Sequence, residues 1–161
     1  MKKNALTKAV EKLIGHDCTV RMYDYFCYDP DTKEICITLF ENNNANREWA
    51  KYLKNTFNFT LTKENLFALS VLHELGHHYT VDYFNEDEWE EQASEKLLKG
   101  LTGSARYQAY YNQPIEKVAT EFAVTLYNEN AENMRAWCHR LNCAVRHYEN
   151  LHHVKTSLTS Y

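Results

Sequence analysis

The segment Lys63–Thr80 constrains this chain more than any other, because it combines a helical apolar pattern with two histidines at helical spacing. The residues of its repeating face recur near a 3.6-residue period; they are Leu66, Phe67, Ser70, Val71, Leu75 and His78. Thr62 is the expected N-cap, with Asn65 near it rather than a full capping box. The segment therefore predicts a helix that begins at Lys63 and ends at Thr80.

Two histidines on this helix are placed to share one metal ion. Residues four apart are neighbours on a helix face, so His73 and His77 can offer two imidazoles to the same cation. Glu74 lies about 100° further round the helix, too far to join them easily but able to take a proton from a water at the site. The alternative is a helix with two surface histidines and a solvated glutamate. The helical context favours a zinc site, with His78 packed or solvated off the ligand face.

A glycine inside the predicted helix requires an explanation. Gly76 lies between the two histidines, where glycine is up to ~1 kcal/mol less favourable than alanine. Something is therefore expected to pass close to its missing side chain, most simply a strand or a substrate.

Composition limits the class of protein. A length of 161 residues predicts one domain over 1–161, with a core at about 5–150 and a tail at 151–161 that lacks periodicity and is expected to be flexible. Apolar residues make up 44% and aromatic residues 14%, which argues against disorder. The net charge of −4 and the lack of a basic stripe give no case for nucleic-acid binding. No apolar run approaches the roughly 20 residues of a membrane span, and the N-terminus lacks the hydrophobic core of a signal peptide.

The cysteines indicate a reducing compartment. Their number, five, is odd, and no two are spaced as Cys-x-x-Cys. A second, structural zinc site is therefore not expected. Reduced thiols in the cytosol fit better than a disulfide framework, and we expect a cytoplasmic protein.

The remaining segments predict a helix-rich α+β domain with a small antiparallel sheet beside the 63–80 helix. An amphipathic helix is expected at 5–14, ended by Gly15. Alternating β-forming residues at 18–27 and 34–40, joined by turn residues at 29–32, predict an antiparallel hairpin. Further helices are expected at 47–57, 85 to about 101, 105–111, 114–126 and 131 to about 148.

A catalytic zinc needs a third protein ligand. The candidates are Glu116, Glu121, Asp82, Glu86, His139 and His147. Glu116 lies near the face of its helix that should point inward, although a first-turn glutamate also suits the helix dipole. Glu121 follows Lys117 by four residues and is expected to form an exposed ion pair with it. Spacing alone leaves the third ligand open.

Two motifs together resemble the ImmA/IrrE family of zinc metallopeptidases, which are His-Glu-x-x-His enzymes with a glutamate as third ligand. They are His-Glu-Leu-Gly-His at 73–77 and Glu-x-x-Ala-x-x-Phe-Ala at 116–123, and the resemblance covers about residues 5–128. It implies that His73, His77 and Glu116 are the zinc ligands and that Glu74 is the catalytic base. Two positions depart from the family pattern. Val118 stands where a second glutamate is common, and Thr120 where asparagine or aspartate often orients a ligand.

The resemblance also implies a function. Family members are bacterial, phage or other mobile-element proteins, and several cut or inactivate a helix-turn-helix repressor. We therefore expect a zinc metalloendopeptidase acting on a protein or peptide, with any repressor partner on a separate chain. Two alternatives stay open: a catalytically weak or inactive interaction module that binds a regulatory protein, and a metal hydrolase acting on a small amide. The donor to the developing oxyanion is also left open, among Tyr79, Tyr110, Tyr111 and His78. No oligomeric state is predicted.

Overall fold

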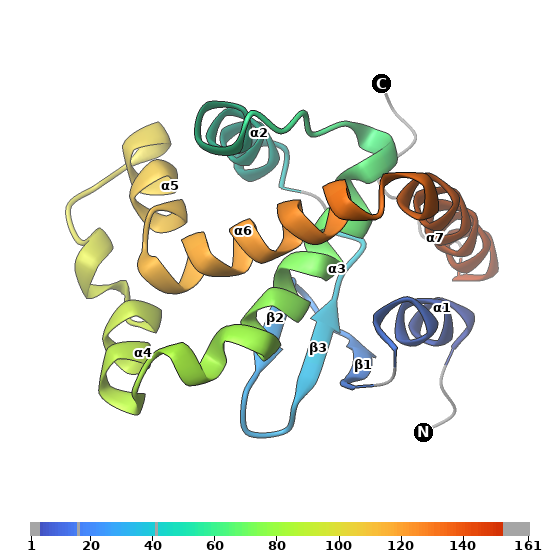
Figure 1. The fold of residues 1–161 in the computed structure, drawn as a ribbon, viewed down its shortest axis with the longest axis horizontal. Coiled ribbons are helices and arrows are strands. Elements are labelled where there is room, and N and C mark those ends of the chain that lie inside the picture. The colour runs from blue at the N-terminus through green and yellow to red at the C-terminus, as the bar shows by residue number, and fades with distance from the viewer. Residues whose placement is uncertain (1–3, 16, 41, 153–161) are drawn as a thin grey trace.

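The computed structural model describes residues 4–15, 17–40 and 42–152. Its elements confirm the expected helix-rich α+β class (Figure 1). In chain order they are α1 (Ala5–Ile14), β1 (Thr19–Met22), β2 (Cys27–Asp29), β3 (Glu34–Ile37), α2 (Asn43–Phe57), α3 (Lys63–Thr80), η1 (Val81–Tyr83), α4 (Glu86–Ala93), η2 (Glu95–Leu98), α5 (Gly103–Tyr111), α6 (Pro114–Glu129) and α7 (Ala131–His152). Residues 153–161, most of the predicted flexible tail, lie outside the described residues.

The three strands form a mixed sheet in the order β1-β3-β2. Strands β2 and β3 are antiparallel, with Cys27 opposite Cys36, which confirms the hairpin around the 29–32 turn. The expected pairing of the first strand is wrong, because β1 runs parallel to β3 with Val20 opposite Ile35. A bend at Asp24 and Tyr25 divides the predicted 18–27 strand into two short ones. That stretch contains neither glycine nor proline, and Asp24 alone is a weak signal of a bend among β-forming residues.

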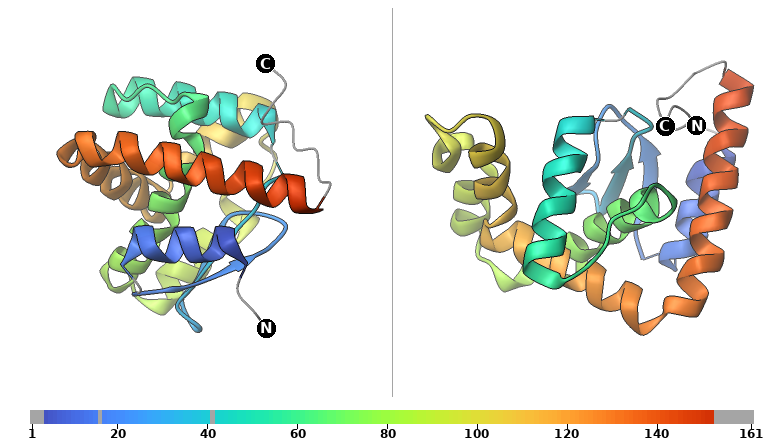
Figure 2. Two further views of the ribbon diagram at one scale, coloured as in Figure 1. Left: turned by 90° about the vertical axis from the view of Figure 1, so that its right-hand side faces the viewer. Right: turned by 90° about the horizontal axis from the view of Figure 1, so that it is seen from above.

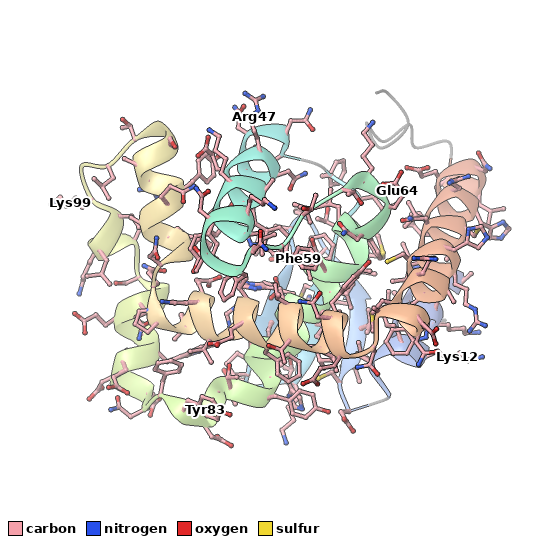
Figure 3. All side chains as sticks on the ribbon, turned by 45° about the horizontal axis from the view of Figure 1, so that its top comes forward. Lys12, Arg47, Phe59, Glu64, Tyr83 and Lys99 are labelled. Atoms are coloured by element: carbon pink, nitrogen blue, oxygen red, sulfur yellow. The ribbon has the colours of Figure 1, made fainter. Side chains whose placement is uncertain are left out.

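Helix α3 lies at the centre of the molecule. It packs most extensively against α6 and also contacts α7, β2 and β3, so that it is covered on several sides (Figures 1 and 2). Its apolar positions are accordingly buried, among them Leu69, Val71 and Leu72. Charged residues such as Lys12 and Lys99 lie at the periphery in Figure 3. The metal motif is therefore carried by the most firmly packed element of the fold.

The ends of α3 match the sequence prediction, and its start is better capped than expected. The Thr62 hydroxyl accepts a hydrogen bond from the Asn65 backbone N–H at 3.3 Å, while the Asn65 side-chain oxygen accepts one from the Thr62 N–H at 2.7 Å. This reciprocal pair is a full capping box, with asparagine in the place usually taken by glutamate or glutamine. The prediction of a simple N-cap without a full capping box is therefore wrong.

The segment between the two motifs is less regular than predicted. The acidic helix ends at Ala93 instead of near residue 101, since Ser94 is extended and a 3₁₀ turn, η2, follows. At the C-terminus, α7 continues to His152, beyond the expected end near Tyr148. Across the described residues, none of these helices combines the length and apolar character required to cross a bilayer.

Candidate metal centre

Three side chains from two helices converge on one point. The Nε2 atom of His73 lies 3.1 Å from Glu116 Oε2 and 3.2 Å from the Nε2 atom of His77. His77 Nε2 lies 3.6 Å from Glu116 Oε1. His73, His77 and Glu116 form a group that can hold a metal ion.

The spacing of these atoms fits a tetrahedral ion. Ligand atoms bonded at ~2.1 Å in a tetrahedral zinc site are roughly 3.4 Å from one another, and the three observed separations range from 3.1 to 3.6 Å. Two imidazoles and one carboxylate are also a known catalytic zinc set, which leaves a fourth position open. The donor set therefore fits a zinc ion in both chemistry and distance.

A close helix crossing holds Glu116 against the two histidines. His73 and His77 are one turn apart on α3, and Glu116 is in the first turn of α6, which Pro114 begins. A Cβ atom built on Gly76 would lie 2.5 Å from the Ala119 carbonyl oxygen. The sequence correctly predicted a close approach at Gly76, but the neighbour is the backbone of α6 rather than a strand or a substrate.

The outer nitrogen of His73 has a partner. Its Nδ1 atom lies 3.1 Å from the Thr120 hydroxyl, and Thr120 is fully buried. If Nε2 binds a metal, Nδ1 carries the ring proton. The Nδ1–H group then donates a hydrogen bond to the Thr120 hydroxyl oxygen, which fixes the orientation of the ring. Thr120 therefore supplies a contact of the kind made by the asparagine or aspartate of the family pattern. The Nδ1 atom of His77 is buried and has no hydrogen-bond partner in the described part of the chain.

Each imidazole also packs edge-on against a tryptophan. Trp49 of α2 lies 5.8 Å from His73 between ring centroids, and Trp89 of α4 lies 5.6 Å from His77. These two aromatic contacts restrict the orientation of both rings. Nothing in the sequence pattern linked Trp49 or Trp89 to the metal motif.

The charges of the centre are strongly coupled. Burial by itself would raise the pKa of Glu116, but hydrogen bonds to His73 and His77 outweigh it and hold that pKa well below its usual range. Burial would lower the pKa of His73, yet the hydrogen bond to Glu116 reverses this and raises it. The Glu116 carboxylate and the His73 imidazole therefore stabilise one another as ions.

Glu74 lies beside this group without belonging to it. It is 6% exposed, and it faces the same cleft as His77 and Glu116. Burial raises its pKa, partly opposed by His73 and His77. A buried carboxylate whose pKa is raised is a better proton acceptor than an ordinary surface glutamate.

The other candidate ligands are not part of this group among the described residues. Glu121 is exposed on α6. His78 points elsewhere, since its Nδ1 atom lies 2.9 Å from the Tyr28 hydroxyl. Val118, the second departure from the family pattern, lines a separate groove with Tyr83 and Phe122, so its identity removes no ligand from the centre.

A cleft of about 990 Å³ opens over the centre. Strand β2 contributes to one wall, and the segment from α4 to the start of α6 contributes to another. Its lining includes the aromatic side chains of Tyr25, Phe26, Tyr28, Trp89, Tyr107 and Tyr110. Among the described residues that line the cleft, the only arginine is Arg106, which is paired with Glu95 at 3.0 Å.

Three of the four candidate oxyanion donors, Tyr79, Tyr111 and His78, already contact other groups of the chain. Tyr79 donates to Asp17, Tyr111 donates to the Ala45 carbonyl at 3.0 Å, and His78 contacts Tyr28. Tyr110 is engaged at the centre itself: it lines the cleft, and burial, the nearby Glu116 and Glu74 carboxylates and a hydrogen bond to Glu116 raise its pKa. A raised pKa keeps its hydroxyl protonated and therefore able to donate.

No protein-family model, curated protein or solved structure matches this chain. The resemblance to the ImmA/IrrE family thus stays a prediction drawn from the two motifs.

Proposed function

We propose that this protein is a zinc-dependent metalloendopeptidase. One observation carries the proposal: the His73, His77 and Glu116 ligand atoms all lie within 4.8 Å of one another, with buried Glu74 facing the same cleft. A bound zinc ion would polarise the scissile carbonyl and lower the pKa of an attacking water to about 7.

Four side chains of this chain have roles in the proposed reaction. Glu74 takes the proton of the attacking water and then delivers it to the leaving amine. Thr120 keeps His73 in the tautomer that leaves Nε2 free to bind metal. Tyr110 is the donor that we assign to the developing oxyanion, because its hydroxyl is in the cleft near Glu116. Trp89 covers His77 and excludes water from that side.

The shape of the site favours a peptide over a small amide. Strand β2 is at the edge of the sheet, and its Cys27 and Tyr28 line the cleft. An edge strand offers unpaired backbone groups to an extended chain, and a cleft of about 990 Å³ has room for several substrate side chains. We propose a protein substrate, and the family resemblance makes a helix-turn-helix repressor the first partner to test.

Metal analysis combined with Glu74→Gln tests this function. The purified protein is expected to contain one zinc ion per chain, and the variant is expected to keep that zinc while losing at least 100-fold in cleavage of a candidate repressor. Glu121→Gln, an exposed change on α6, is the matched control and should cleave normally. Chelation should abolish cleavage, and added zinc should restore it.

The same experiment distinguishes the proposed peptidase from an interaction module that binds a repressor without cutting it. Stoichiometric zinc with repressor binding but no cleavage by the wild-type protein would support a module that binds without cutting. A protein that takes up no metal when zinc is supplied would contradict the proposal outright.

A further inference from the structure

A buried glutamine beside the metal centre has no hydrogen-bond partner for its side chain. Gln113 is 5% exposed, and it lines the cleft together with Glu116. Within the described residues, neither its Nε2 nor its Oε1 atom is hydrogen-bonded. A buried amide left unpaired is destabilising, so the Gln113 side chain requires a polar partner that the described residues do not supply.

The Gln113 side-chain amide forms no hydrogen bond to the neighbouring turn or to the start of α6. The backbone of Gln113 is fully bonded, since its N–H donates to the Tyr110 carbonyl at 3.0 Å and its own carbonyl accepts from Lys117 at 2.9 Å. Gln113 is at the N-cap position of α6, yet its side chain makes no capping bond. Gln92 fills that need instead, because its Oε1 atom accepts from the Ile115 N–H at 2.9 Å.

The donors and the acceptor of the Gln113 carboxamide indicate which kind of ligand it can bind. A carboxamide offers donors and an acceptor side by side, and a main-chain peptide group offers the matching N–H and C=O. An anion would use the donors only, and it would meet Glu74 and Glu116 in the same cleft. The cleft's arginine, Arg106, is already paired with Glu95. A neutral peptide group is therefore the best match.

We propose that the Gln113 carboxamide binds one main-chain peptide group of an extended substrate, three residues before Glu116 on the chain. This inference rests on the proposed peptidase function. It makes Gln113 a substrate-binding residue that sets the register of the peptide against the ligands of the metal centre. Strand β2 would hold the peptide on the other wall of the cleft.

The test measures peptide binding rather than cleavage. Zinc-loaded protein carrying Glu74→Gln is used to select binders from a random octapeptide library, and affinities for the tightest peptide are measured by calorimetry. Adding Gln113→Met, which is similar in size but apolar, is expected to weaken binding by about tenfold or more. Its zinc content should be unchanged, and its melting temperature should be equal or higher, because unpaired polar atoms are removed. Asn112→Leu, an exposed neighbour outside the cleft lining, is the control and should bind normally.

A scan of N-methylated peptides identifies the peptide group involved. Methylation of one backbone nitrogen should weaken binding to the Gln113 protein and have a much smaller effect on the Gln113→Met protein. A library without binders, or equal affinity of the two proteins for every peptide, would overturn the inference. If Gln113-dependent binding is found but wild-type protein never cuts the selected peptides, the proposed peptidase function fails while this inference stands.

Discussion

The backbone of Ala119 lies directly against Gly76, so that a side chain at position 76 would meet the Ala119 carbonyl oxygen at 2.5 Å. This contact sets the distance between α3 and α6, and with it the distance between the paired histidines and Glu116. The glycine in the metal motif is therefore a requirement of helix packing.

Replacing Gly76 by alanine is the first test of this relationship. Overpacking typically costs about 1–3 kcal/mol, which outweighs the ~1 kcal/mol of helix propensity that alanine adds. We expect Gly76→Ala to lower the free energy of unfolding and to weaken zinc binding, because the neighbouring group is backbone and α6 has to move. Chemical denaturation and a chelator competition assay measure the two effects.

Gly100→Ala provides the matched control for that experiment. Gly100 has a φ of +83° and nothing within 4 Å of a built Cβ, so alanine there strains the backbone without moving a helix. It should lower stability while leaving zinc affinity unchanged. Equal zinc affinity in both variants would show that the α3–α6 contact does not control the metal site.

The contact between Thr120 and His73 predicts a second effect on metal affinity. Thr120→Val keeps the size of the side chain but removes the hydroxyl that lies 3.1 Å from His73 Nδ1. Loss of such an outer partner typically weakens metal binding about 10–100-fold. Thr120→Ser keeps the hydroxyl and should bind zinc nearly as tightly as the wild type. A valine variant with wild-type zinc affinity would mean that the hydrogen bond does not orient the ring.

Features of the site that depend on neighbouring residues were predictable from the sequence, and features that depend on contacts between distant segments were not. The limits of α3 were predictable, because its periodicity and the Thr62 cap are local. The choice of Glu116 was not decidable from spacing, since it depends on how two helices cross at Gly76 and Ala119. The motif resemblance supplied that choice, and the observed cluster agrees with it.

Other features gave no local signal at all. The parallel pairing of β1 depends on a bend at Asp24 and Tyr25, where the sequence has neither glycine nor proline and only one turn-favouring residue, Asp24. In the sequence, Gln113 is an ordinary polar residue before Pro114, and only the packed structure buries its side chain beside the cleft. Both features arise from tertiary contacts, which a periodic pattern does not encode.

The two tryptophans beside the imidazoles predict an optical signal of metal binding. Trp49 and Trp89 lie 5.8 and 5.6 Å from His73 and His77 between ring centroids. Copper(II) at the site should therefore quench their fluorescence, whereas zinc, with a filled d shell, should block copper without quenching. Titration of the Trp49→Phe and Trp89→Phe variants with copper(II) should show less fluorescence quenching in each variant than in the wild type. Trp137→Phe, on α7, should keep most of it, and strong quenching in the Trp49→Phe/Trp89→Phe double variant would place copper elsewhere.

The packing of α5 on α2 predicts how stability depends on pH. The Glu48 carboxylate accepts hydrogen bonds from Lys51 at 2.7 Å and Ser104 at 2.6 Å, and with a further bond from Gln108 these lower its pKa to about 2. Because the folded pKa is lowered, the contribution of Glu48 to stability is complete above its usual pKa of 4.5 and is lost as the pH falls towards 2. Glu48→Gln should therefore be less stable than the wild type at neutral pH, and the difference should disappear on acidification. Urea unfolding at a series of pH values measures this, with the exposed Glu129→Gln expected to follow the wild type throughout. A difference that stays constant down to pH 2 would show that the charge of Glu48 does not hold α5 in place.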